Sequence, residues 1–168
     1  MAPHRPPAEY YASLPKAIAA GSDLFHDPNG AVLLVQPSYR DDTWEIPGGA
    51  MDAGEYPWQT ARREIREELG LDLRSGRLLA VDWVLPRPDG RPALVHFVFD
   101  GGVLTHEEAR NSVHLPPDEL LAWRFCQPAE TDRLVEARVA RRIHAGRAAL
   151  SGGHVAYLQD GHPVNTRG

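Results

Sequence analysis

A short helix bounded by glycine and proline is the feature of this sequence that most constrains its fold. The glycines and proline of residues 47–54 break regular structure, and residues 57–69 then have a helical pattern. Proline suits the first turn of a helix, and Gly70 suits the position just beyond its end. The sequence therefore predicts a helix with well-defined ends, preceded by a glycine-rich loop.

One face of this predicted helix is acidic. Glu64, Glu67 and Glu68 are spaced i, i+3 and i+4, so their carboxylates share one side. Like charges at this spacing destabilise an isolated helix by a few tenths of a kcal/mol each, and a hard divalent cation such as Mg²⁺ would offset that cost. A solvated helix whose neighbouring arginines pair with the glutamates explains the same pattern, and both interpretations stay open at this point.

The loop before the helix carries two further signals. Glu55 and Arg63 are placed to form an ion pair that would fasten the loop to the helix. The glycines of residues 48–54 permit positive φ values and a close approach of the backbone to a ligand or metal.

The whole segment resembles the Nudix (MutT-type) hydrolase box, a pattern of glycine, glutamate, Arg-Glu, paired glutamates, glycine and aliphatic residues at fixed spacing. The positions that fill it are Gly49, Glu55, Arg63, Glu64, Ile65, Glu67, Glu68, Gly70 and Leu71. Residues 44–48 also resemble the strand that leads into the box. The resemblance implies an α/β (α+β) fold, a Nudix-like α/β/α sandwich with a mixed β-sheet and the box as loop–helix–loop.

The same resemblance implies an enzyme that hydrolyses the pyrophosphate bond of a nucleoside diphosphate linked to another group X. Candidate substrates are ADP-ribose-like compounds, nucleotide sugars and (d)NTPs, and the implied cofactor is Mg²⁺ (or Mn²⁺). Glu64, Glu67, Glu68 and the carbonyl of Gly48 match the metal ligands. Glu64 or Glu67 matches the general base, and Arg63 matches a supporting catalytic residue.

Other site residues are less constrained by the pattern. Glu119 resembles a late catalytic glutamate that family members supply after the box, with Glu107 and Glu108 as alternatives. Arg40 is the candidate for phosphate contact, and Gly49 the candidate for close backbone approach to the substrate.

The identity of the substrate stays open. Pro86 lies 16 residues after the last box glycine, an offset similar to a marker of ADP-ribose pyrophosphatases in the family, although it also opens a proline-rich turn. Tyr39, Trp83 and His96 could stack on or hydrogen-bond a base, but packing is the favoured explanation for each of them.

Around the box, the pattern predicts an irregular N-terminal arm over residues 1–14 and a tail over 151–168 that could add a hairpin. The resemblance implies a Nudix domain over residues 15–150. Strand-like runs lie at residues 17–20, 31–36, 78–85, 93–99 and 123–126. A long helix is expected over residues 131–150, with Thr131 as its N-cap. Arg138, Arg141 and Arg142 are expected on its solvated face.

Composition excludes several classes of protein. A formal net charge of −5 argues against a nucleic-acid binder, and no apolar run approaches the roughly 20 residues that cross a bilayer. The N-terminal residues lack the apolar core of a signal peptide, so a cytoplasmic protein is expected. The single cysteine, Cys126, excludes an internal disulfide and a zinc site of two or more cysteines.

The expected partner is a small-molecule nucleotide substrate, with no nucleic acid and no membrane, and the chain is expected to be a monomer or homodimer.

Two other functions are considered beside the enzyme. The alternative is a Nudix-fold protein that senses a nucleotide without turnover, although a pure binder has no need of the intact glutamates. Isomerisation of an isoprenoid diphosphate is disfavoured because Cys126 is far from the box in sequence.

Overall fold

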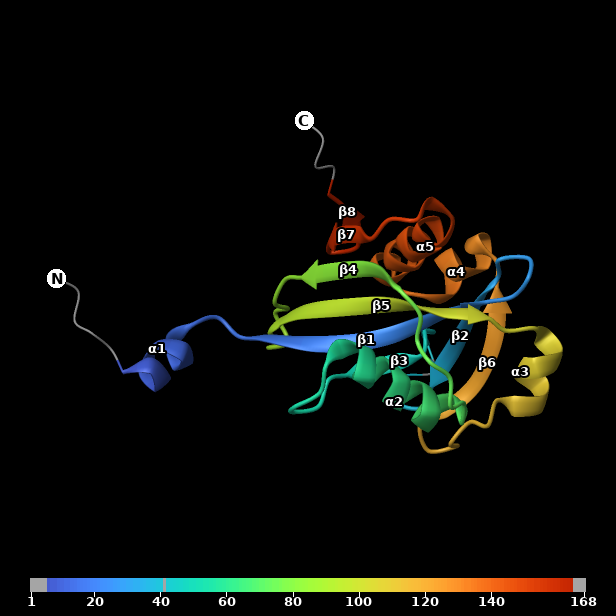
Figure 1. The fold of residues 1–168 in the computed structure, drawn as a ribbon, viewed down its shortest axis with the longest axis horizontal. Coiled ribbons are helices and arrows are strands. Elements are labelled where there is room, and N and C mark those ends of the chain that lie inside the picture. Colours follow the sequence, from blue (N-terminus) through green and yellow to red (C-terminus); the bar gives the residue numbers. More distant parts are fainter. Residues whose placement is uncertain (1–5, 41, 165–168) are drawn as a thin grey trace.

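A mixed eight-stranded sheet between two helical layers forms the fold (Figure 1), as expected. The computed structural model describes residues 6–40 and 42–164. The strands are β1 Ala17–His26, β2 Val32–Pro37, β3 Gly48–Ala50, β4 Leu78–Val84, β5 Ala93–Val103, β6 Leu120–Cys126, β7 Ala156–Gln159 and β8 His162–Pro163. The helices are α1 Pro7–Ser13, α2 Pro57–Leu69, α3 His106–Ser112, α4 Pro128–Leu134 and α5 Ala137–Gly152. The strand order is β6-β2-β1-β5-β4-β7-β8, and β3 pairs with β1.

Hydrophobic residues of β2 pack into the hydrophobic cores on both faces of the sheet. Val32 and Leu34 join the core around Ile143 of α5, whereas Leu33 joins the core around Ile65 of α2. Successive side chains of a strand point to opposite faces, and a strand covered on both faces is apolar throughout. The continuous apolar run at the start of β2 is therefore explained by helices on both sides.

Strand β1 changes partner along one edge, and this change places the glycine-rich loop beside it. One edge of β1 pairs in parallel with β5 along its length. On the other edge, Ala20 to Ser22 pair with β3, and only His26 pairs with β2. A Cβ atom at Gly21 would collide with the carbonyl of Pro57, so this glycine lets the start of α2 lie directly against β1.

Helix α2 has the bounds that the sequence predicts. Pro57 lies at its start, and Gly70 ends it in the left-handed conformation with φ of 70°. Ile65 and Leu69 are fully buried on its inner face. The acidic positions therefore lie along the rest of the helix surface, next to β3.

Three expectations about secondary structure are wrong. Residues 131–150 do not form one helix: α4 ends at Leu134, whose carbonyl accepts a hydrogen bond from the Trp44 N–H, and Val135 is extended. Thr131 is a buried interior residue of α4 and not an N-cap. The expected lead-in strand at residues 44–48 is reduced to one β-bridge between Val35 and Glu45 before β3 begins.

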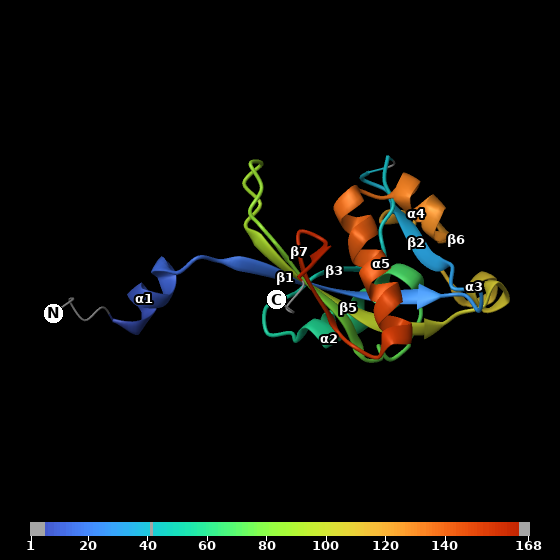
Figure 2. The same ribbon diagram turned by 90° about the horizontal axis from the view of Figure 1, so that it is seen from above.

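The N-terminal arm is not wholly irregular. Residues 7–13 form α1, because Pro7 fits the first turn and the residues after it are compatible with a helix. Figures 1 and 2 show α1 standing apart from the sheet at the start of β1. Residues 1–5 of the expected arm lie outside the described residues.

The C-terminal tail adds to the edge of the sheet. Strand β7 pairs in parallel with β4, and β8 turns back to pair antiparallel with β7. Residues 165–168 of the tail lie outside the described part of the chain. Within residues 6–40 and 42–164, no helix has the length and apolar character needed to cross a membrane.

Candidate active site

The glutamates of α2 meet the backbone of β3. The N–H of Gly48 donates a hydrogen bond to Oε2 of Glu68 at 2.8 Å. A Cβ atom at Gly49 would collide with the carboxylate of Glu64, so glycine at this position leaves room for that carboxylate beside the strand. Gly48 has a φ of 142°, a conformation that favours glycine. The two glycines thus bring carboxylates and strand backbone together.

Arg63 connects the loop to the acidic face. Its Nε donates to Oε1 of Glu55 at 2.8 Å, which is the expected ion pair. Its Nη1 donates to Glu64 at 2.8 Å and to Glu67 at 2.9 Å, and its Nη2 also donates to the carbonyl of Ala50. A planar guanidinium with five N–H donors can make all these bonds at once, and an ammonium group cannot.

The pKa values of these carboxyl groups diverge. The Arg63 guanidinium lowers the pKa of Glu55 to about 2. Burial raises the pKa of Glu68 to about 8, with the charges of Glu64, Glu45 and Glu119 adding to the rise. Burial also raises the pKa of Glu64, against the effect of Arg63. Burial therefore disfavours the charged forms of Glu64 and Glu68.

The chemistry of the donor set fits a divalent cation. Carboxylate and carbonyl oxygens are the ligands that Mg²⁺ prefers, and a nearby cation favours the charged form of a buried carboxyl group. Arg63 lies between Glu64 and Glu67, and Glu68 is bonded to Gly48. In the described part of the chain, accordingly, no three His, Cys, Asp or Glu side chains are already arranged to hold a metal ion.

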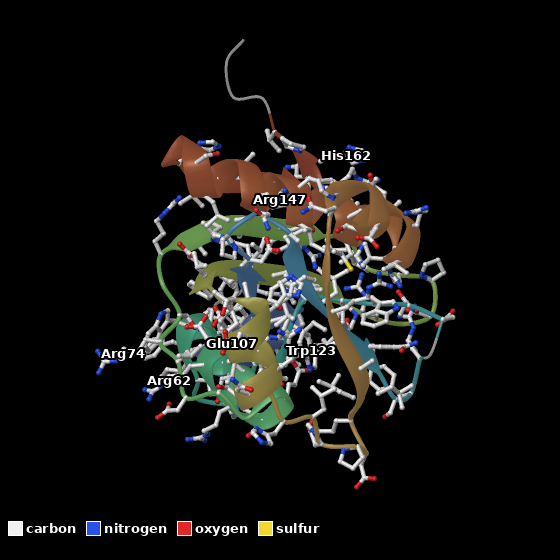
Figure 3. The ribbon with its side chains drawn as sticks, turned by 90° about the vertical axis from the view of Figure 1, so that its right-hand side faces the viewer. Arg62, Arg74, Glu107, Trp123, Arg147 and His162 are labelled. Carbon is white, nitrogen blue, oxygen red and sulfur yellow. The ribbon has the colours of Figure 1, made fainter. Side chains whose placement is uncertain are left out.

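The candidates outside the box separate into two groups. Glu119 lies close enough to affect the pKa values of Glu64 and Glu68, so it belongs to the same electrostatic environment. Glu108 instead accepts the hydrogen bond of the Thr105 N–H at the start of α3. Glu107 is exposed on the same helix (Figure 3).

A cavity of about 320 Å³ adjoins Gly48 and Gly49. We call it the arginine pocket, because five of its lining residues are arginines. Its lining residues are Ile18, Ala19, Ala20, Tyr39, Arg40, Thr43, Trp44, Glu45, Gly48, Gly49, Ala50, Arg87, Arg91, Leu94, His96, Glu136, Arg138, Val139 and Arg142. Arg40, Tyr39 and His96 are thus at this cavity, whereas Trp83 is not among its lining residues.

Arg142 is not on a solvated face, contrary to expectation. It is 3% exposed, and its guanidinium pairs with the fully buried Asp82 at 2.8 Å. Its Nη1 lies 3.0 Å from Nδ1 of His96, whose Nε2 is 2.8 Å from the Ser22 hydroxyl. Since arginine can only donate, Nδ1 of His96 accepts and Nε2 carries the proton that the serine oxygen accepts. Burial and the charge of Arg142 lower the pKa of His96, consistent with the neutral ring.

Sequence reasoning missed most of the arginine pocket. Arg87 and Arg91 come from the loop between β4 and β5, and Arg138 comes from the first turn of α5. The spacing of Arg138 and Arg142 by four residues was a signal that both share one helix face. No signal in the sequence places that face beside the β4–β5 loop.

A sheet covered by helices on both faces, with an acidic helix held against a glycine-rich strand, defines the class of the protein as an α/β/α sandwich. The family model described as "NUDIX domain" matches residues 16–148, and the chain therefore belongs to the Nudix family of hydrolases.

Comparisons with individual proteins agree with this family. Human "Diphosphoinositol polyphosphate phosphohydrolase 3-alpha" is 48% identical over 50 residues, which are 30% of each chain. The match thus spans less than a third of that relative. Two solved structures share the fold: a UDP-X diphosphatase (TM-score 0.70, 21% identity, covering 92% of this chain and 76% of that one) and the MutT protein of Methanosarcina mazei Go1 (0.64, 20%, 84% and 99%).

Proposed function

We propose that the protein is a divalent-metal-dependent pyrophosphohydrolase that cleaves the P–O–P bridge of a nucleoside diphosphate linked to another group X. One observation carries the proposal: Glu64 and Glu68, on the acidic face of α2, meet the backbone of Gly48 and Gly49 at the edge of a cavity. The cavity is large enough for a small molecule, since ligand sites in proteins start at about 300 Å³.

The proposed metal ligands are Glu64, Glu67, Glu68 and the carbonyl of Gly48, and the proposed cofactor is Mg²⁺ or Mn²⁺. Such a cation neutralises phosphate oxygens and makes a water molecule more acidic. The burial of Glu68, which raises its pKa, supports this assignment, because a cation would favour its charged form. When a cation binds, Arg63 would exchange its bonds to Glu64 and Glu67 while retaining its bonds to Glu55 and Ala50.

The chain's own residues have distinct proposed roles. Glu64 or Glu67 accepts the proton of the attacking water, and Glu119 adds a carboxylate to the same environment. Arg63 is a positioning residue, because it contacts the carboxylates and the loop and orients both. Arg40 and Gly49, both at the arginine pocket, are the proposed substrate contacts. The cytoplasmic location and the monomer or homodimer state stay predictions from the sequence.

The alternative is a protein that binds a nucleotide without turnover. The intact carboxylates favour the enzyme, because binding alone does not require three glutamates on one helix face. Nucleotide binding without release of phosphate or a nucleotide product would favour the sensor.

The test is a panel of nucleotide substrates with Mg²⁺ or Mn²⁺. The panel contains ADP-ribose, dNTPs, nucleotide sugars and dinucleoside polyphosphates, and the products are separated chromatographically. We expect turnover of at least one class, and a loss of kcat on the order of 100-fold in Glu67→Gln, because a ligand or general base is removed.

The matched control is Glu107→Gln, which removes an equal charge from an exposed position of α3. It should leave turnover unchanged. Absence of products across the panel, or an equal kcat in the wild-type protein and Glu67→Gln, would contradict the proposal.

A further inference from the structure

The arginine pocket extends away from the proposed metal site. Along β1, Gly48 of β3 lies opposite Ser22, and Ala93 at the start of β5 lies opposite Ala17. Five residues of strand separate these points, or roughly 17 Å. The β4–β5 loop, which carries Arg87 and Arg91, precedes Ala93 and projects as a narrow hairpin beyond the sheet (Figure 2). The pocket therefore has one end at Gly48 and Gly49, the glycines that Glu68 and Glu64 contact, and another at this loop.

Positive charge is in excess at the loop end. Arg87 donates to both carboxylate oxygens of Glu136, at 2.9 and 3.0 Å, and Arg138 donates to the same carboxylate at 3.2 Å. Two guanidinium groups thus share one carboxylate, which leaves one net positive charge. Nη1 of Arg138 is buried and has no hydrogen-bond partner within residues 6–40 and 42–164.

Arg91 adds a second uncompensated charge. Its side chain donates only to backbone carbonyls, those of Pro92 at 2.9 Å and Leu85 at 3.0 Å. Among the described residues, no carboxylate forms an ion pair with it. The two carbonyls fix the guanidinium in place without cancelling its charge.

The other two arginines of the pocket do not contribute to this excess. Arg142 is neutralised by Asp82. Arg40 lies 3.9 Å from Asp42, and its charge also acts on the Glu45 carboxylate. Among the residues that line the loop end of the pocket, three arginines therefore face the single carboxylate of Glu136. Asp89 in the same loop accepts a hydrogen bond from the backbone N–H of Arg91 and is not a lining residue.

We propose that the loop end of the arginine pocket binds an anionic substituent on the group X of the substrate, through Arg87, Arg91 and Arg138. The proposal rests on the proposed function, because X is defined by the bond that is cleaved. Guanidinium groups bind carboxylates and phosphates through charge-assisted, often bidentate hydrogen bonds. The recognised chemistry is thus a carboxylate or phosphate about one sugar unit or more beyond the scissile bridge.

Matched substrate pairs test this selectivity. UDP-glucuronate and UDP-glucose differ by a carboxylate, and ADP-ribose 1″-phosphate and ADP-ribose differ by a phosphate. We expect kcat/KM to be at least about tenfold higher for the anionic member of one pair or both, which is the size of one charge-assisted hydrogen bond. The pair that shows the larger ratio identifies carboxylate or phosphate as the preferred anion.

Variants locate the anion contact. Arg91→Gln should lower the anionic-to-neutral ratio about tenfold, whereas a merely structural role would lower both members of a pair equally. Arg110→Gln, at an exposed position of α3, is the matched control and should leave the ratio unchanged. An equal kcat/KM within both pairs, or an unchanged ratio in Arg91→Gln, would overturn the proposal.

Binding separates this inference from the proposed function. If none of the four compounds is hydrolysed, calorimetric titration of the wild-type protein with each pair in Mg²⁺ measures the same preference. Tighter binding of the anionic member, weakened in Arg91→Gln, would support the pocket assignment while the turnover assignment fails. Equal affinity within both pairs, or no binding of any compound, would overturn the pocket assignment.

Discussion

Asp23 is a carboxyl group in the interior of the sheet. It is 1% exposed on β1, and Oδ2 accepts a hydrogen bond from the Ser75 hydroxyl at 2.8 Å. Its Oδ1 has no hydrogen-bond partner in the described part of the chain. Burial raises its pKa from 3.8 to about 6, with Ser75 opposing the shift and Asp100 adding to it.

This shift predicts how stability depends on pH. An acid whose folded pKa lies above its unfolded value destabilises the fold as pH rises from about 4 to about 6, and the cost is constant above that window. Two pKa units correspond to about 3 kcal/mol. Asp23→Asn should therefore raise the free energy of unfolding at pH 8, and the gain should vanish near pH 4, as measured by urea unfolding at each pH.

Ser75→Ala provides the opposite test. Removing the hydroxyl that donates to the carboxylate should raise the pKa of Asp23 further and extend the loss of stability to pH values above 6. If the free energy of unfolding depends on pH in the same way in the wild-type protein and both variants, this account is contradicted.

A contact between two residues could be predicted from the sequence when the residues lie close together along the chain. Glu64, Glu67 and Glu68 share a face because helix geometry fixes it, and the Glu55–Arg63 pair needs only a short loop. The arginine pocket joins the β4–β5 loop to α5, about fifty residues later. Such a contact depends on the tertiary fold and leaves no periodic signal in the sequence.

Secondary-structure elements also differ in how well the sequence predicts them. Helix α2 was predictable because proline and glycine at its ends set its limits through backbone conformation alone. The break between α4 and α5 was not, since the apolar spacing continues across it. The Trp44 N–H donates a hydrogen bond to the Leu134 carbonyl, and Val135 packs in the core although its backbone is extended.

Gly70 tests how strongly its conformation fixes the end of α2. Its φ of 70° is costly for a residue with a Cβ, whereas asparagine tolerates it better than other residues. Gly70→Ala should lower the free energy of unfolding by about 1 kcal/mol, and Gly70→Asn by less. The nearest atom to an added Cβ is Cβ of His114 at 3.4 Å, an ordinary contact, so sterics do not obscure the comparison. Denaturant unfolding that ranks alanine equal to or above asparagine would contradict this reason.

Across the whole molecule, a chain of buried polar groups connects the active-site side of the sheet to the C-terminal hairpin. It begins at Ser22, opposite Gly48, and passes through His96 of β5 to Arg142 of α5. Asp82 of β4 then accepts from Arg142 and from the N–H of Gly161, in the turn between β7 and β8. The general order of strands and helices could be read from hydrophobic runs, but this connection could not, because its members come from five separate elements.

The Asp82–Arg142 pair makes this connection testable. Replacing Asp82 by asparagine keeps the volume but leaves the Arg142 guanidinium without a counter-charge in the interior, and breaking a buried pair in this way costs about 3 kcal/mol or more. Asp82→Asn should therefore lower the free energy of unfolding by about that amount. It should also raise KM for the substrate, because Arg142 and His96 line the pocket.

The control is Asp118→Asn, a matched substitution at an exposed position before β6, which should leave both quantities unchanged. The double variant Asp82→Asn with Arg142→Met removes the orphaned charge and should recover part of the lost stability. It should not recover the KM, because Arg142→Met removes the contact between Arg142 and His96. Urea unfolding and substrate kinetics on the four proteins separate the two effects. If Asp82→Asn is as stable as the wild-type protein, the buried chain does not tie the C-terminal hairpin to the pocket.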